Sequence, residues 1–95
     1  MRHWPFEDPQ NVAVFTVRSI LDGDDWIYYV THDEEDGAWQ FHPRAGPTRE
    51  QDARVVALRI VMILDPSIGE LADLPLGWHA WRESPGRPWV REPKA

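Results

Sequence analysis

Two alternating runs of residues on either side of Asp36-Gly37 constrain the fold of this chain more than any other feature. They cover residues 26–32 and 38–42, and both are rich in aromatic residues. Aromatic and β-branched residues favour strands, and an Asp-Gly pair between two such runs is a strong signal for a hairpin turn. The sequence therefore predicts an antiparallel β-hairpin.

The pleat of this hairpin predicts which residues reach the core. Ala38 pairs either with Asp33 or with Glu35. These two registers differ by two residues, so both place each side chain on the same face of the hairpin. The more apolar face is the better core candidate, and it carries Trp26, Tyr28, Val30, His32, Trp39 and Phe41. The opposite face is mixed, which fits a half-covered surface. Its residues are Ile27, Tyr29, Thr31, Gln40 and His42.

The remaining elements are short. Residues 12–17 are rich in β-branched residues and predict a strand, and residues 18–23 predict one helical turn ending at a glycine. Residues 54–57 and 58–64 predict a strand followed by a short helix, although periodicity alone also allows a strand throughout.

A further short helix is predicted after Asp65. Either Asp65 is its N-cap, with Pro66 in the first helical position, or Ser67 and Glu70 form a capping box. Pro75 ends this helix. Beyond it, we predict an irregular chain with a last short strand over residues 89–91.

Together these elements predict an α+β fold with an antiparallel sheet of about four strands and two or three short helices packed on one face. The length of 95 residues fits one domain, which we place at residues 12–95. Residues 1–11 carry two prolines and predict a flexible N-terminal arm, which Trp4 and Phe6 could pin to the body.

The composition excludes several classes of protein. Sixteen acidic residues against ten basic ones give a net charge of −6, so nucleic acid is not an expected partner. The chain has no cysteine, which excludes disulfides and thiolate metal sites. It shows neither the apolar run of a signal peptide nor that of a membrane-spanning helix, so we expect a cytoplasmic protein.

The densest acidic run predicts an exposed hairpin tip. It lacks the ligand spacing of an EF-hand loop, so no metal site is expected there. A docking patch for a basic protein is the functional alternative. The run comprises Asp33, Glu34, Glu35 and Asp36.

No residue set amounts to a catalytic signature. His32 and His42 fall on opposite faces of the hairpin, so they should not share a metal ion. Ser67 is explained by helix capping and Ser84 by a turn. We therefore expect no enzyme, no cofactor and no metal.

The tryptophan-rich tail allows three interpretations. Its rings are core anchors, or they form a ligand pocket with Arg82 or His79, or its end presents a protein-binding patch, since Trp and Arg are enriched in interface hot spots. We expect Trp26, Trp39 and one of the first two tail tryptophans in the core. The candidate binding residues of the tail are Trp78, His79, Trp81, Arg87, Trp89 and Arg91.

Residues 57–77, together with the tyrosine-rich strand, the acidic hairpin and Trp39-Gln40-Phe41, resemble a family of small bacterial proteins of unknown function. That family has been proposed to supply immunity proteins of polymorphic toxin systems. Asp65-Pro66 and Pro75-Leu76-Gly77 are the most specific parts of the resemblance. It implies an α+β domain without known catalysis and transfers no active-site residues.

The leading hypothesis is a non-enzymatic protein-binding module, in its specific form an immunity protein that neutralises a toxin or other basic protein. The acidic hairpin tip and the exposed part of the tail would make the contact. The alternative is a small-molecule-binding or enzymatic domain with an aromatic pocket around Trp78, His79 and Trp81, joined by Tyr28 and Tyr29. A third hypothesis is a homodimer that hides the tail.

Overall fold

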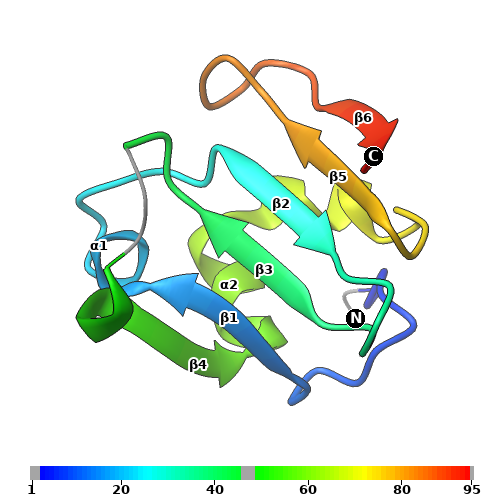
Figure 1. Ribbon diagram of the computed structural model, residues 1–95, viewed down its shortest axis with the longest axis horizontal. Coiled ribbons are helices and arrows are strands. Elements are labelled where there is room, and N and C mark those ends of the chain that lie inside the picture. Colours follow the sequence, from blue (N-terminus) through cyan, green and yellow to red (C-terminus); the bar gives the residue numbers. More distant parts are fainter. Residues whose placement is uncertain (1–2, 46–48, 95) are drawn as a thin grey trace.

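The computed structural model describes residues 3–45 and 49–94, which form a six-stranded mixed sheet with short helices on one side (Figure 1). The strands are β1 (Ala13–Val17), β2 (Tyr29–His32), β3 (Trp39–His42), β4 (Ala53–Ala57), β5 (Trp78–Trp81) and β6 (Val90–Pro93). The α-helices are α1 (Arg18–Leu21) and α2 (Leu58–Leu64), and the 3₁₀-helices are η1 (Glu50–Asp52) and η2 (Pro66–Leu71). Across the sheet the strands follow the order β4-β1-β3-β2-β5-β6.

The α+β class is confirmed, but the prediction of about four antiparallel strands is only roughly right. The sheet is mixed because β1 runs parallel to β3, with Phe15 beside Gln40. The second strand of the hairpin, β3, is the one that lies beside β1. It runs in the same direction as β1, so this contact is parallel. The tail adds β5 and β6 at the other edge.

The predicted hairpin is present in the first of its two registers. His32 pairs with Trp39, and the Asp33 N–H donates to the Ala38 carbonyl at 2.8 Å. Gly37 closes the turn with φ of 72°, a left-handed conformation that glycine adopts without strain.

The first strand of the hairpin is shorter than predicted. It begins at Tyr29, so the alternation expected from residue 26 does not hold before it. Ile27, assigned to the half-covered face, is instead buried in the core at 2% exposure. Trp26, expected in the core, is only half-buried.

The predicted change from strand to helix occurs between Ala57 and Leu58, so the alternative of one continuous strand is wrong. The Leu58 N–H still donates to the Val12 carbonyl at 2.9 Å, and the chain then turns away from the sheet. Leu58 and Val61 are fully buried, and this burial draws α2 against one face of the sheet.

Asp65 is the N-cap of the next helix, as one of the two predictions stated. Its Oδ1 accepts from the Ser67 N–H at 3.0 Å, and Pro66 takes the first helical position. The helix is η2, a 3₁₀-helix, and it buries Ile68 and Leu71.

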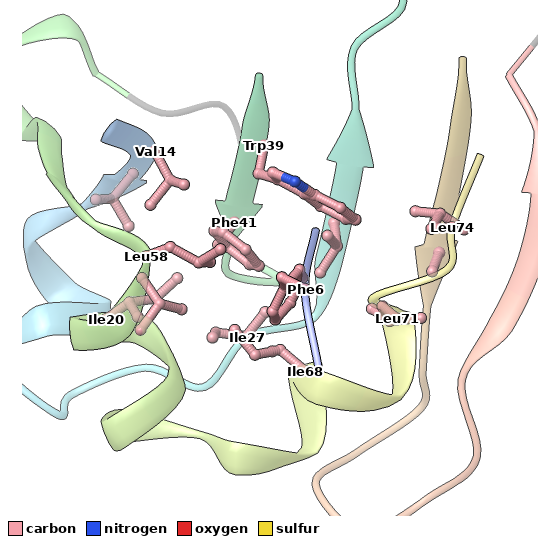
Figure 2. Close-up of a cluster of buried hydrophobic side chains, with 14 residues drawn as sticks. Phe6, Val14, Ile20, Ile27, Trp39, Phe41, Leu58, Ile68, Leu71 and Leu74 are labelled. Carbon is pink, nitrogen blue, oxygen red and sulfur yellow. The ribbon is translucent and has the colours of Figure 1, made fainter. Parts of the chain in front are cut away.

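The core lies between the sheet and this helical layer (Figure 2). Trp39 and Phe41 extend from β3 into it, and Phe6 packs edge-on against Trp39 with ring centroids 5.3 Å apart. Phe6 is 5% exposed, and the Trp4 indole N–H donates to the Asp8 carbonyl at 2.7 Å. The packing of Phe6 therefore attaches the arm to the core, and residues 1–2 lie outside the described part of the chain. The flexibility of residues 1–11 stays a prediction.

The tail departs most from its prediction. In place of an irregular chain, residues 78–81 form β5, which pairs with β2. The last strand spans residues 90–93 instead of 89–91. Strand β5 carries a tryptophan on each of its two faces. Its four residues therefore show no apolar–polar alternation that would have predicted a strand.

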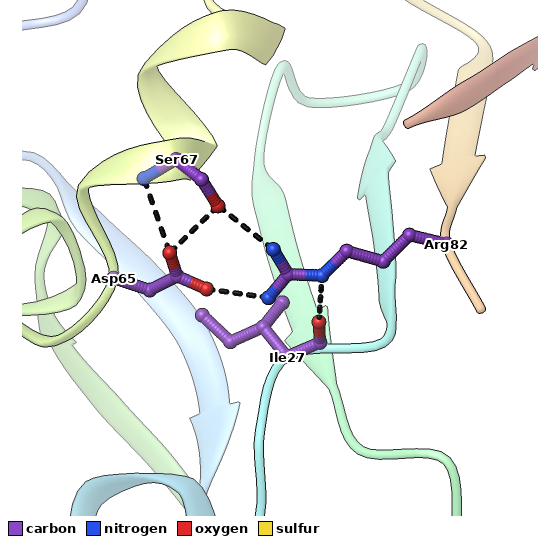
Figure 3. A network of polar contacts seen from close by, with 4 residues as sticks. All are labelled: Ile27, Asp65, Ser67 and Arg82. Atoms are coloured by element: carbon purple, nitrogen blue, oxygen red, sulfur yellow. Dashed lines mark hydrogen bonds and ion pairs between the residues drawn. The ribbon is translucent and has the colours of Figure 1, made fainter. Parts of the chain in front are cut away.

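A buried arginine ties the end of β5 to the start of η2 (Figure 3). Arg82 is 2% exposed, and its Nη2 donates to Asp65 Oδ2 at 2.5 Å. Its Nη1 donates to Ser67 Oγ at 2.8 Å and its Nε to the Ile27 carbonyl at 3.0 Å. The guanidinium lies over the Trp89 ring, 4.3 Å from its centroid. This arginine is therefore part of the scaffold.

Candidate functional site

The sheet has one covered and one uncovered face. In Figure 1, α2 and η2 lie behind the strands, and no helix of the described residues lies in front of β1, β3 and β2. The side chains on the front face are therefore the best candidates for a functional surface.

The strand register identifies a first row of side chains on this face. Residues directly opposite one another on neighbouring strands point to the same side. Gln40 on β3 lies opposite Thr31 on β2, which lies opposite His79 on β5. Phe15 and Glu92 continue the row on β1 and β6.

A second row runs parallel to the first. His42 on β3 lies opposite Tyr29, which lies opposite Trp81 on β5, and Val90 on β6 ends the row. The first three of these side chains are half-buried against their neighbours. The uncovered face thus carries a cluster of aromatic and polar groups.

Hydrogen bonds fix the orientation of one part of this cluster. Asp33 Oδ2 accepts from Gln40 Nε2 at 2.6 Å, and Gln40 Oε1 lies 2.9 Å from His42 Nε2. An ionised carboxylate only accepts, so the Gln40 amide nitrogen must face Asp33 and its oxygen must face His42. His42 Nε2 therefore carries the hydrogen, and Nδ1 of the neutral ring remains an acceptor.

Burial favours the neutral form of His42. It lowers the pKa of the imidazole below its usual 6.5, and Lys94 adds to this effect while Asp33 opposes it. The orientation derived above therefore describes the ring at neutral pH.

A second short contact joins the phenol of Tyr29 to the ring of His79. The Tyr29 oxygen lies 2.6 Å from His79 Nδ1. Burial and the charge of Asp33 raise the pKa of Tyr29, so the phenol keeps its proton. The His79 ring also meets Trp81 edge-on, with ring centroids 5.4 Å apart. The Tyr29 oxygen keeps lone pairs that can accept a further hydrogen bond.

Thr31 is the most unusual member of the cluster. It is 3% exposed, and among the described residues its Oγ1 has no hydrogen-bond partner. Buried hydroxyls are normally bonded, so this one is expected to reduce stability.

The predicted acidic patch borders this face. An open hollow of about 500 Å³ is lined by the four acids of the hairpin tip together with Gln40 and Lys94. Asp33 joins the cluster through Gln40, while Asp36 Oδ1 accepts from the Ala38 N–H at 2.9 Å within the turn. Glu34 and Glu35 are exposed. In the described residues, no group of three or more histidines and carboxylates is placed to hold a metal ion.

The structure divides the candidate residues of the first tail strand. Strand alternation places Trp78 on the covered side, where it packs against the core, and places His79 and Trp81 on the uncovered side. The aromatic pocket considered around these residues is therefore split by the sheet. Tyr29 lies on the uncovered side, whereas Tyr28 precedes β2, so strand alternation does not place it.

The end of the tail is divided as well. Arg87 is exposed, whereas Trp89 packs against the core and the Arg82 guanidinium. Arg91 Nη1 donates to Asp73 Oδ1 at 2.8 Å. Two of these candidate side chains thus have partners within the fold.

Sequence reasoning did not propose Thr31, Gln40 or His42 as site residues, and it named Tyr29 only for the alternative aromatic pocket. It did place them together on the mixed face of the hairpin, which was the available signal. The sequence did not predict that β5 pairs with β2. This pairing adds His79 and Trp81 to the mixed face of the hairpin and completes the cluster.

Comparison with known proteins found no match to a protein-family model, a curated protein or a solved structure. Within residues 3–45 and 49–94, no helix has the length and apolar character needed to span a membrane.

Proposed function

We propose that this chain is a non-enzymatic protein-binding module that holds a basic partner on the uncovered face of its sheet, as an immunity protein holds its toxin. The observation that carries this proposal is the cluster of half-buried aromatic and polar side chains on a face over which the described residues place no helix. Aromatic residues are enriched in protein interfaces because they combine large area with few rotatable bonds.

Apolar groups extend the same face toward the β4 edge. Phe15 is 43% exposed, and Val55, directly opposite it on β4, is 60% exposed. Adjacent exposed apolar side chains beside a polar cluster are typical of an interaction surface. A partner lying across β1, β3 and β2 would cover both parts.

The shape of the face favours a protein over a small molecule. Small-molecule sites enclose most of the ligand surface. The hollow beside the cluster is open, and the tail tryptophans lie on both sides of the sheet. The net charge of −6 and the acids of the hairpin tip favour a basic partner through complementary charge.

The proposal is tested by co-purification with the product of the adjacent gene, since immunity genes lie beside their toxins. We expect a complex on gel filtration that is lost in Trp81→Ser and Phe15→Ser. Ile63→Ser is the matched control, because Ile63 is 72% exposed on α2, away from this face.

Two outcomes would overturn the proposal. In the first, the complex survives both substitutions on the uncovered face but is lost in Ile63→Ser. In the second, sedimentation shows a stable homodimer that both substitutions dissociate, which would make a second copy of the chain the occupant.

A further inference from the structure

We infer that the uncovered face receives an arginine side chain of the partner, held by Asp33, His42 and Tyr29 and stacked on the neighbouring rings. This inference rests on the proposed function and names the chemistry of the partner's anchor. It follows from the direction of the hydrogen bonds in the cluster and from the way this same fold binds its own arginine.

The cluster presents hydrogen-bond acceptors that are not used within the fold. Asp33 offers carboxylate lone pairs beyond the one used by Gln40. His42 offers Nδ1, because its Nε2 hydrogen faces Gln40. Tyr29 offers its phenolic oxygen, which has two lone pairs and keeps at least one of them free in its contact with His79. Tyr29 lies directly opposite His42, and Gln40 joins Asp33 to His42, so all three acceptors lie on the uncovered face.

The cluster also offers aromatic rings. Tyr29 and His42 have ring centroids 6.2 Å apart, and Tyr29 and His79 have centroids 5.4 Å apart. A guanidinium group stacks on such rings while donating hydrogen bonds from its edge. An ammonium group is compact and cannot do both in this way, so arginine is favoured over lysine.

The fold already binds arginine side chains of its own through carboxylate, hydroxyl and aromatic groups. Arg82 is held by the Asp65 carboxylate, the Ser67 hydroxyl and a backbone carbonyl, with the Trp89 ring over its guanidinium. Arg44 likewise lies over the Tyr28 ring, 5.3 Å from its centroid. The uncovered face offers the same combination of a carboxylate, a hydroxyl, a further acceptor and aromatic rings.

Lys94 makes the inference sharply testable. It lines the hollow beside Asp33 and Gln40, and its charge reaches His42. A like charge opposes an incoming arginine. Removal of Lys94 should therefore strengthen binding, whereas removal of the Asp33 charge should weaken it.

The experiment is an NMR titration of the full chain with acetyl-arginine amide, and with acetyl-citrulline amide as the uncharged isostere. We expect the arginine compound to shift the signals of Tyr29, His42 and His79, and the citrulline compound to leave them in place. Asp33→Asn should weaken binding about fivefold, as expected of a half-buried charge, and Lys94→Met should tighten it about twofold, as expected of an exposed one.

Matched controls carry the same substitutions elsewhere. Asp24→Asn changes an exposed acid in the loop before β2, and Arg59→Met removes an exposed cation on α2. Both should leave the affinity unchanged. Equal shifts from the two compounds, or equal effects of the site and control variants, would overturn the inference.

Reversed signs would also overturn it. Tighter binding of the arginine compound in Asp33→Asn together with weaker binding in Lys94→Met would show that Asp33 does not hold the guanidinium. The result is separable from the proposed function. If the arginine compound fails while the co-purified partner still depends on Trp81, only the anchor is wrong; if the partner does not depend on Trp81, the proposed function is wrong.

Discussion

The two faces of the sheet carry similar polar chemistry in different settings. On the covered side, Arg82 is enclosed, and its carboxylate, hydroxyl and carbonyl partners all belong to the fold. On the uncovered side, Asp33, Gln40 and His42 bond one another along the surface. The first set is enclosed and stabilises the fold, whereas the side chains of the second set stay partly exposed to solvent.

The largest expected contrast lies between two tryptophans on opposite faces. Trp39 is 1% exposed and fills the core, so Trp39→Ala should lower the free energy of unfolding by about 4 kcal/mol. Trp81 is half-buried on the uncovered face, and Trp81→Ala should lower it by about 1 kcal/mol. Chemical denaturation measures both values. Equal losses would show that the uncovered face is as much a part of the core as the covered one.

The second contrast concerns Arg82. Arg82→Met removes a buried cation and leaves Asp65 without its ion-pair partner, so we expect a loss of about 3 kcal/mol of unfolding free energy. Arg59→Met, on the exposed side of α2, is the control and should change stability by less than about 0.5 kcal/mol. A loss below about 1 kcal/mol in Arg82→Met would argue that this network contributes specificity more than stability.

The third contrast uses one substitution on both faces. Thr16 and Thr31 are both buried, but Thr16 Oγ1 donates to the Phe41 carbonyl at 3.0 Å, whereas Thr31 Oγ1 has no partner among the described residues. Thr16→Val should therefore lower the free energy of unfolding by about 1 kcal/mol, and Thr31→Val should raise it by up to about 1 kcal/mol. Thermal unfolding of the two variants checks the opposite signs. A loss of stability in Thr31→Val would show that this hydroxyl has a bonding partner such as water.

Local chemistry explains which parts of the fold the sequence predicted. The hairpin register, the change from strand to helix at Leu58 and the Asp65 cap all depend on residues close together in the chain. The parallel contact of β1 with β3 depends on packing between distant segments, and no local pattern reports it.

The candidate site was predicted only in part for the same reason. The mixed face of the hairpin was assigned correctly for Tyr29, Thr31, Gln40 and His42. The completion of this face by β5 was not predicted. Trp78 and Trp81 are both tryptophan but lie on opposite faces of the sheet, so residue type alone could not assign them. Ile27 was misplaced because it precedes the strand, where alternation no longer applies.

The smallest expected effect is a pH dependence that belongs to the uncovered face. Burial lowers the pKa of His42 in the folded chain below its usual 6.5, so the unfolded chain binds a proton first as the pH falls. The stability that depends on the neutral ring is therefore complete above about pH 6.5 and is lost as the pH falls from there through the lower folded-state pKa. His42→Gln removes this proton uptake and should flatten the fall in unfolding free energy between about pH 7 and pH 5. His3→Gln, at an exposed histidine, is the control and should retain the slope of the unsubstituted chain. If His42→Gln also keeps that slope, the uncovered face does not hold His42 in its neutral form, and the acceptor role assigned to its Nδ1 would have to be withdrawn.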